Sequence, residues 1–441
     1  MTLNIDSKIS VGDKHYLKDS IVRSDKIKLI YIFSIALIFG FRVAPLFDPS
    51  SLWAEDANAL FGPAISDLNH EASPGLLSTY KEQVFLFNRL IAQVILFFVG
   101  NQYLILPFVS TLVSVILVPI LASIWLRKNA LFRSEKYNYL VFGYVLLSPV
   151  SHEPLGNLAN IATYLLFCCV ALVGIAKPKS KIGFIFELYL VLLATFTGGL
   201  AIILFVVLLL RKFLTGYFPK IQISLVVLSL IFQAKGWLGR GSTNFNLIQD
   251  FSMTVNILFK RIGAETLTGQ TSGAKLDEHF SANIWNIVGL IILLLVFFPI
   301  LMIFVKSGFN SSRAIFVLPI ILFCYFGMFI YSNVETGLND LLTFGAQGRH
   351  LIVLHLLLFV LALIVFEYST RIRDRRIFLP TLLFLVIVAG GTLSDFVLQD
   401  KTPSVFASYW EDFAKCVEKR KAYCYTRVPP DTLGWGLAWK P

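Results

Sequence analysis

Long apolar runs, separated by short polar segments, recur along the whole chain. A helix needs about 20 mostly apolar residues to cross a bilayer core, and about eleven runs approach that length. They lie near residues 27–47, 103–126, 137–150, 159–176, 183–197, 199–210, 220–236, 284–305, 314–331, 350–367 and 378–397. The pattern predicts an all-α polytopic membrane protein of about 11 transmembrane helices.

The composition supports this class and excludes two others. Of 441 residues, 56% are hydrophobic and only 15% are charged, with a net charge of +11. The mean hydropathy is +0.73. A disordered chain or an ordinary soluble enzyme does not have this balance. We therefore expect membrane lipid, and no nucleic acid, among the partners.

The basic residues indicate an orientation, because short cytoplasmic loops are enriched in Lys and Arg. With a cytoplasmic N-terminus, the basic segments 8–28, 127–136, 177–181, 211–220, 306–313 and 371–376 all fall inside. Most acidic residues then fall outside, together with the C-terminus. The first apolar run has full span length and no small-residue cleavage site, so we expect a retained anchor.

The regions outside the membrane are loops and a tail. Residues 1–397 form one predicted transmembrane domain, with outer loops at 48–102 and 237–283, and residues 398–441 form an outer tail. Residues 84–99 are apolar, but a span there would move the basic segment 127–136 outside. We therefore predict a helix in the outer interface, with Arg89 at headgroup depth.

Residues 250–262 predict a second surface helix. Phe251, Val255, Leu258 and Ile262 recur at helical spacing, with Lys260 and Arg261 on the opposite face. This is the pattern of an amphipathic helix on a membrane surface, not of a catalytic motif.

The five cysteines divide into two groups. Cys168, Cys169 and Cys324 fall within predicted spans, where they act as small buried apolar residues. Cys416 and Cys424 lie eight positions apart in the outer tail. In an oxidising exterior this spacing favours a local disulfide over two free thiols, and no zinc-site spacing surrounds the pair.

The first outer loop carries adjacent carboxylates, Glu55 and Asp56, directly after Trp53 and Ala54. One carboxylate could act as a general base that deprotonates an acceptor hydroxyl during glycosyl transfer. Alternatively, both carboxylates could simply favour the positive end of a helix dipole. The sequence leaves both interpretations open.

Three arginines in or near the outer regions are candidates for binding a lipid phosphate. Arg89, Arg240 and Arg349 keep their charge, and guanidinium pairs with phosphate oxygens bidentately. The alternative for each is an anchor that extends from the membrane to the headgroup layer.

A polar turn between two predicted spans is a candidate acceptor site. It contains His152 and Glu153, followed by Asn157 and Asn160. Such side chains could orient the hydroxyls of a sugar, or could satisfy the backbone of their own loop.

Several motifs are missing from the sequence. No phosphate-binding loop, His-Glu-x-x-His motif, dinucleotide fingerprint or nucleophile elbow occurs, which argues against a nucleotide-driven motor or a zinc protease. The six histidines are scattered, so no metal site is predicted. No cofactor is certain, although acidic residues could hold a divalent metal near a phosphate.

Taken together, these residues resemble the GT-C superfamily of integral-membrane glycosyltransferases. Trp53 to Asp56 match the acidic motif of the first outer loop in that family. Tyr80 and the segment Asn88-Arg89-Leu90-Ile91-Ala92 are similar to a further motif, with Asn88 in the place of a proline. Weaker similarities are Leu158-Ala159-Asn160, Thr197-Gly198-Gly199, Gly348-Arg349-His350 and the tail with its paired cysteines and Pro429-Pro430.

The resemblance implies a function. Asp56 or Glu55 would be the general base, and Arg89 or Arg349 would hold the phosphate of a polyprenyl-phosphate sugar donor. The acceptor would be a surface glycan or lipid-linked O-antigen of lipopolysaccharide, modified with a hexose such as glucose at the periplasmic face of a bacterial inner membrane. Two alternatives stay open: a flippase or transporter of lipid-linked sugars, and an O-antigen polymerase.

Overall fold

The computed structural model describes most of the chain. The described residues are 11–47, 52, 56–61, 79–80, 83–84, 86–100, 102–148, 155–197, 201–238, 247–307, 313–333, 338–344, 348–396, 405–419, 424–427 and 436–439.

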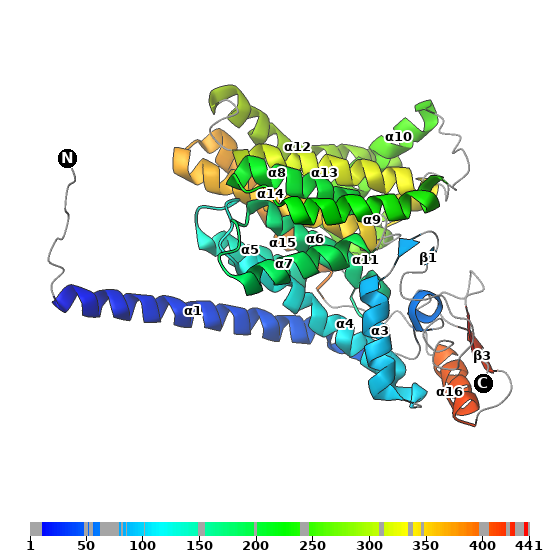
Figure 1. Ribbon diagram of the computed structural model, residues 1–441. Helices are drawn as coiled ribbons and strands as arrows, with labels where there is room; N and C mark the ends of the chain where they lie inside the picture. Colours follow the sequence, from blue (N-terminus) through cyan, green and yellow to red (C-terminus); the bar gives the residue numbers. More distant parts are fainter. Residues whose placement is uncertain are drawn as a thin grey trace.

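Helices dominate the described chain, as the apolar pattern predicts, and each predicted apolar run coincides with a helix (Figure 1). The α-helices are α1 (Val11–Val43), α3 (Leu86–Val99), α4 (Leu106–Ala122), α5 (Glu135–Leu147), α6 (Ile161–Val170), α7 (Lys181–Thr195), α8 (Ala201–Thr215), α9 (Lys220–Leu238), α10 (Leu247–Ile257), α11 (Glu265–Asp277), α12 (Ala282–Ser307), α13 (Arg313–Asn333), α14 (Gly348–Ile372), α15 (Arg375–Ser394) and α16 (Val405–Glu418).

Short 3-10 and π segments extend or link these helices. They are η1 (Ala44–Phe47), η2 (Asp56–Phe61), η3 (Tyr103–Ile105), η4 (Ser123–Leu126), η5 (Leu158–Asn160), η6 (Ala171–Gly174), η7 (Leu258–Ala264) and η9 (Leu338–Leu342). Two antiparallel strand pairs complete the described chain: β1 (Thr79–Tyr80) with β2 (Gln83–Val84), and β3 (Cys424–Arg427) with β4 (Gly436–Trp439).

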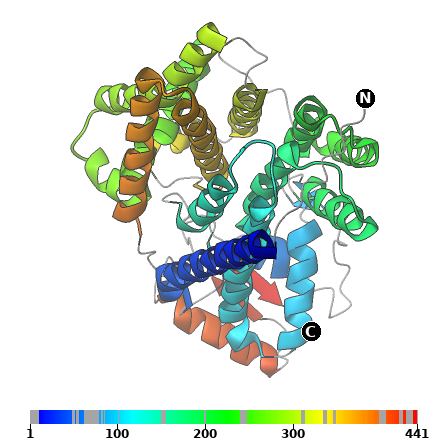
Figure 2. The same cartoon turned by 90° about the vertical axis from the view of Figure 1, so that its left-hand side faces the viewer.

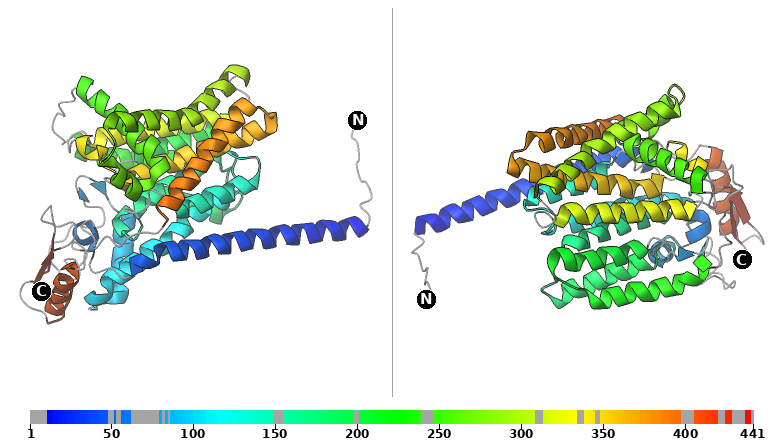
Figure 3. Two further views of the ribbon diagram at one scale, coloured as in Figure 1. Left: turned by 180° about the vertical axis from the view of Figure 1, so that it is seen from behind. Right: turned by 90° about the horizontal axis from the view of Figure 1, so that it is seen from above.

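The helices form an elongated bundle with two different ends (Figures 1 and 3). One end carries η2, α16 and the β3–β4 pair, and we call it the disulfide end. The other end carries the turns between α5 and η4, between α7 and η6, between α8 and α9, and between α14 and α15. We call it the basic end, because residues 127–136, 177–181, 211–220 and 371–376 lie there.

The centre of the bundle is α14. Its apolar segment is 89% buried inside the protein, whereas that of α1 is only 22% buried. Phe33 and Phe41 on α1, and Val305 on α12, remain at least two-thirds exposed. So much exposed apolar surface on peripheral helices is typical of contact with lipid.

Within the part of the chain that the structure describes, six helical segments are long and apolar enough to cross a membrane: Ile27–Phe47, Tyr103–Leu126, Ala282–Lys306, Arg313–Asn333, His350–Ile372 and Arg375–Ser394. Three shorter apolar helices are Leu86–Val99, Leu158–Gly174 and Lys220–Phe232. The chain is thus a multi-pass membrane protein by length and composition, while the count of about 11 spans stays a prediction.

Helix α3 differs in direction from the bundle. Its axis is close to vertical in Figure 1, where the long helices are close to horizontal. It is also close to vertical in the view turned by 90° (Figure 2), so α3 lies across the bundle. Phe97 and Phe98 are about 80% exposed near its C-terminal end, whereas Asn88 and Arg89 are buried near its N-terminal end. Residues 84–99 thus contain the predicted helix, while its placement in the outer interface stays a prediction.

Glycines allow η7 to pack directly on α12. A Cβ atom on Gly289 would lie 1.8 Å from the carbonyl oxygen of Phe259, and one on Gly263 would lie 2.5 Å from that of Gly289. Neither position accepts a side chain without moving the backbone. Close approach through small residues is a usual mode of helix packing in membranes.

Candidate functional site

Asp56 begins η2 and is almost completely buried at the disulfide end, with 2% of its surface exposed. Its Oδ1 accepts a hydrogen bond from the backbone N of Ala159 at 2.7 Å. Its Oδ2 accepts from the backbone N of Leu158 and from Ser110 Oγ, each at 3.1 Å. Asp56 therefore caps the start of the helix formed by η5 and α6, where backbone N–H groups and the helix dipole favour a negative charge.

Asn88 holds the same segment from α3. Its Nδ2 donates to the carbonyl oxygens of Leu158 at 2.6 Å and of Ala159 at 2.9 Å. The backbone of Leu158 and Ala159 is thus bound on its N–H side by Asp56 and on its C=O side by Asn88. Asn88 stands where the resembled family has a proline. It makes two bonds that proline could not make, because proline has no side-chain amide.

Three buried asparagines beside this junction have polar atoms without a hydrogen-bond partner. These atoms are Asn88 Oδ1, both side-chain polar atoms of Asn157, and Asn160 Nδ2. The residues are at most 5% exposed. Asn157 occupies the N-cap position of η5, yet makes no side-chain cap bond, since Asp56 accepts from Leu158 and Ala159 instead. Leaving buried amides unbonded is unfavourable by about 1–3 kcal/mol per group, so the hydrogen-bonding capacity of these asparagines is not satisfied within the described part of the protein.

We call this group of side chains, Asp56, Asn88, Ser110, Asn157 and Asn160, the asparagine cluster. It combines one carboxylate, one hydroxyl and three amides, which can both donate and accept hydrogen bonds. Amide and carboxylate groups of this kind can form hydrogen bonds with hydroxyl groups.

Arg89 follows Asn88 on α3 and is 4% exposed. The beginning of α3 is fixed on the end of α7, because the backbone N of Leu86 donates to Phe196 O at 3.0 Å and that of Phe87 to Thr197 Oγ1 at 3.1 Å. Arg89 therefore lies buried at the disulfide end, one residue after Asn88 of the asparagine cluster.

The other predicted site residues are placed less completely. Tyr80 lies in β1, paired with Gln83 of β2, and Arg349 is the second residue of α14. The positions of their side chains are outside the described part of the structure. Glu55, His152, Glu153 and Arg240 lie outside the described residues altogether.

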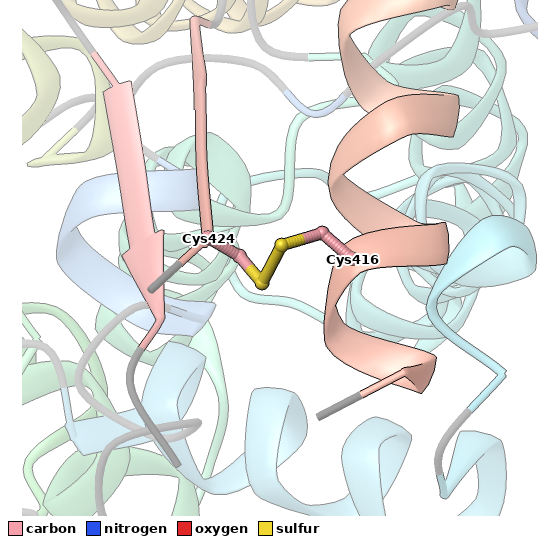
Figure 4. Close-up of a disulfide and its surroundings, with 2 residues drawn as sticks. All are labelled: Cys416 and Cys424. Atoms are coloured by element: carbon pink, nitrogen blue, oxygen red, sulfur yellow. A yellow bond between two sulfur atoms is a disulfide. The ribbon is translucent and has the colours of Figure 1, made fainter. Parts of the chain in front are cut away.

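The disulfide between Cys416 and Cys424 is confirmed (Figure 4). It joins the last turn of α16 to the first residue of β3. Trp410 of α16 is 2% exposed and donates from Nε1 to the carbonyl oxygen of Tyr103 at 3.1 Å. The disulfide-linked tail thus packs on η3, which leads directly into α4, the helix that supplies Ser110.

A second buried polar group was not predicted. Arg261 of η7 donates from Nε to Glu265 Oε2 at 2.9 Å and from Nη1 to Leu341 O at 2.6 Å. His355 of α14 lies 3.0 Å from Arg261 O through Nε2 and 3.1 Å from Thr266 Oγ1 through Nδ1. Because a carbonyl only accepts, His355 Nε2 carries a proton.

The surface helix predicted at residues 250–262 is therefore partly wrong. The segment is helical, but Arg261 is fully buried and Lys260 is 8% exposed, whereas Phe251 is 66% exposed. The π-helical turn η7 shifts the helical phase after Ile257, so the polar face deduced for a regular α-helix points inward.

Asp395 forms a third buried junction at the end of α15. Its Oδ2 accepts from the backbone N of Gln270 at 2.7 Å, and its Oδ1 from that of Thr271 at 3.2 Å. Gly269 has φ 70°, and a Cβ atom there would lie 2.8 Å from the Asp395 Cβ. Burial raises the pKa of the Asp395 carboxyl, against the opposing hydrogen bonds from Thr271 and Gln270 and the charge of Arg42.

Among the described residues, no group of three or more His, Cys, Asp or Glu side chains could hold a metal ion. Comparison of the chain with known proteins found no matching family, no matching curated protein and no matching solved structure.

Proposed function

We propose that the chain is a membrane glycosyltransferase of the GT-C type. In this proposal it transfers a hexose from a polyprenyl-phosphate donor to a hydroxyl group of a surface glycan or lipid-linked O-antigen. The reaction takes place at the disulfide end, on the periplasmic face of a bacterial inner membrane. The proposed topology has about eleven spans, a cytoplasmic N-terminus and a periplasmic C-terminus.

The asparagine cluster is the observation that carries the proposal. Asn88, Asn157 and Asn160 have four buried side-chain atoms without a partner, around a segment that Asp56 holds. Sugar hydroxyls both donate and accept, so a sugar can pair with such amides where an apolar ligand cannot. The acidic motif that ends at Asp56, and its resemblance to the GT-C first outer loop, support the same interpretation.

Asp56 has two proposed contributions. Its hydrogen bonds to Leu158 N, Ala159 N and Ser110 Oγ make it a positioning residue for the Asn157–Asn160 turn. In the glycosyl transfer mechanism, it or Glu55 also takes the proton from the acceptor hydroxyl as that oxygen attacks the anomeric carbon of the donor. The lipid phosphate leaves with the electrons of the broken glycosidic bond.

Basic side chains would stabilise the charge on the leaving phosphate. Arg89 is buried in the same end as Asp56, and Arg349 begins the central helix α14. Arg240 is a third candidate from the loop after α9. Truncation of Arg349 to Ala should mainly weaken the use of the donor, since the acceptor contacts are unchanged.

One observation favours the transporter alternative. Arg261, Glu265 and His355 are all at most 2% exposed. Ionisable groups buried in membrane helices commonly mark transport pathways. In the glycosyltransferase proposal these three residues only fasten η7 to α14.

Mass spectrometry of the surface polysaccharide distinguishes the proposals. We would compare cells in which the gene is deleted with cells in which it is restored. Loss of one sugar per repeat in the deletion, with chain length kept and the sugar regained on restoration, supports a glycosyltransferase. Shortened chains with intact repeats support the polymerase, and an unchanged polysaccharide contradicts the proposal and favours the transporter.

A further inference from the structure

A basic patch at the end of α8 stands apart from the other charged groups at the basic end. It consists of Lys212 at the end of α8, Lys220 at the start of α9 and Arg313 at the start of α13, all exposed. Helices α8 and α13 meet there, because Arg313 Nη1 donates to the carbonyl oxygen of Phe213 at 3.3 Å, and α9 follows α8 after the short turn 216–219 and packs against it. We call these three side chains the α8 patch.

No carboxylate is available to neutralise the α8 patch from its own elements. Helices α8, α9 and α13 contain no Asp or Glu, and neither do the connecting residues 216–219 and 308–312. The neighbouring Glu187 is 2% exposed and is bound by Arg211 and Gln222. By contrast, Lys28 pairs with Glu135, and Lys306 pairs with Asp374.

Aromatic rings support the cations of the patch. Lys212 Nζ lies 5.1 Å from the ring centroid of Phe218, and the Arg313 guanidinium lies 5.2 Å from that of Phe213. Both rings are partly exposed, at 37% and 36%. Cation–π contacts hold the charged groups beside apolar surface without neutralising them. A ligand that fits must therefore offer a negative charge next to apolar chains.

We propose that the α8 patch binds the headgroup of an anionic phospholipid of the surrounding bilayer. The phosphate lies among Lys212, Lys220 and Arg313, and the acyl chains lie along the exposed apolar residues of α8 and α9, such as Leu209 and Leu228. Basic pockets between membrane helices bind anionic headgroups in this way. The site is at the opposite end from the asparagine cluster, so it is independent of the proposed glycosyl transfer.

Lipid titration followed by native mass spectrometry tests the proposal. The purified full-length chain in neutral detergent is titrated with phosphatidylglycerol or with phosphatidylcholine of the same acyl chains. We expect phosphatidylglycerol to bind about tenfold or more tightly than phosphatidylcholine. Replacing Lys212, Lys220 and Arg313 together by Gln should weaken phosphatidylglycerol binding about tenfold or more and leave phosphatidylcholine binding unchanged.

The matched control removes three charges from another turn of the same end. In the variant with Arg371, Arg375 and Arg376 replaced by Gln, the affinity for phosphatidylglycerol should change by less than about threefold. An equal loss in both triple variants would overturn the proposal, since total charge would then explain the binding. Equal affinity of the wild type for the two lipids would overturn it as well.

A single variant covers the case in which the triple variant does not fold. Lys220→Gln should weaken phosphatidylglycerol binding by about fivefold, because one basic residue beside an anionic surface contributes about that factor. Retention of full affinity by folded Lys220→Gln would contradict the assignment of this residue to the patch.

Discussion

The two ends of the bundle each bury a carboxylate, and they treat it differently. At the basic end, Glu187 of α7 is bound by Arg211 Nη1 at 2.6 Å and Nη2 at 3.0 Å, and by Gln222 Nε2 at 3.0 Å. Arg211 also donates to the carbonyl oxygens of Ile175 and Ala176. At the disulfide end, Asp56 binds backbone N–H groups and a serine hydroxyl.

The difference lies in the surrounding amides. Among the described residues that bind Glu187, Gln222 has one buried atom without a partner, Oε1, whereas four buried atoms of the three asparagines lack one in the asparagine cluster. The ion pair of Glu187 and Arg211 links α7 and α8, and Gln222 adds α9, so its groups serve stability rather than ligand binding. Asp56 lies among unbonded amides, which add less to stability and are suited to binding. We infer that the basic end holds the helices together, whereas the disulfide end binds the ligand.

The largest expected effect on stability comes from breaking the closed ion pair. Glu187→Gln leaves the Arg211 guanidinium buried without its counter-charge and should lower the free energy of unfolding by about 3–5 kcal/mol. Thermal unfolding in detergent measures the loss. The double variant Glu187→Leu/Arg211→Leu should recover most of it, since no charge is then buried. An unchanged unfolding temperature in Glu187→Gln would contradict the anchoring role.

Removing the disulfide should have the next largest effect, and only at the disulfide end. Replacing Cys416 and Cys424 by Ser should destabilise the docked tail by about 2–3 kcal/mol, given the short loop that the bond closes. Hydrogen exchange should then increase in α16 and in η3, which Trp410 contacts. Exchange that increases equally in α8 and α9 would show that the two ends are not separate.

Two asparagines give a sharper comparison. Asn129 at the basic end donates to Ala171 O at 3.0 Å and accepts from Leu131 N at 3.0 Å, whereas Asn157 has no side-chain partner. Asn129→Ala should therefore cost about 1–3 kcal/mol of stability and leave sugar transfer unchanged per folded molecule. Asn157→Ala should not lower the unfolding temperature, because it removes two unbonded buried polar atoms, and should reduce transfer about fivefold to tenfold. The reverse pattern would contradict the division between the two ends.

The smallest effect concerns pH. Burial raises the pKa of Asp395, so its protonated form is favoured in the folded state. Its contribution to stability is complete below the unfolded pKa of about 4 and is lost as pH rises through the raised pKa. Unfolding temperatures measured from pH 4 upward should therefore fall more for the wild type than for Asp395→Asn, which does not titrate. Parallel curves would contradict this assignment.

The sequence was sufficient to predict the helices and the disulfide. The predicted apolar runs coincide with helices, and Cys416 and Cys424 are bonded, because both signals are local in the chain. Asp56 was also a candidate from its position after the first span. Its contacts with Leu158 and Ala159, 102 and 103 residues away, depend on tertiary packing and could not be read from the sequence.

The buried group at Arg261 could not be predicted for two reasons. The apolar spacing predicts a regular α-helix over residues 250–262, whereas the chain forms a π-helix at Leu258–Ala264. His355 lies inside an apolar run, and its partner Arg261 is 94 residues away. Asn88 was noticed only as a substitution for proline, since hydrogen bonding to a distant backbone leaves no periodic signal.

The comparison of Asp56→Asn with Asp395→Asn tests the central claim most directly. Both carboxylates are buried and accept hydrogen bonds from two backbone N–H groups. Each variant would be expressed in the deletion strain at matched membrane abundance, and the sugar content of the surface polysaccharide measured. We expect Asp56→Asn to lower the transferred sugar by about a hundredfold or more and Asp395→Asn to retain it. Full transfer by Asp56→Asn, or an equal loss in both variants, would contradict the account.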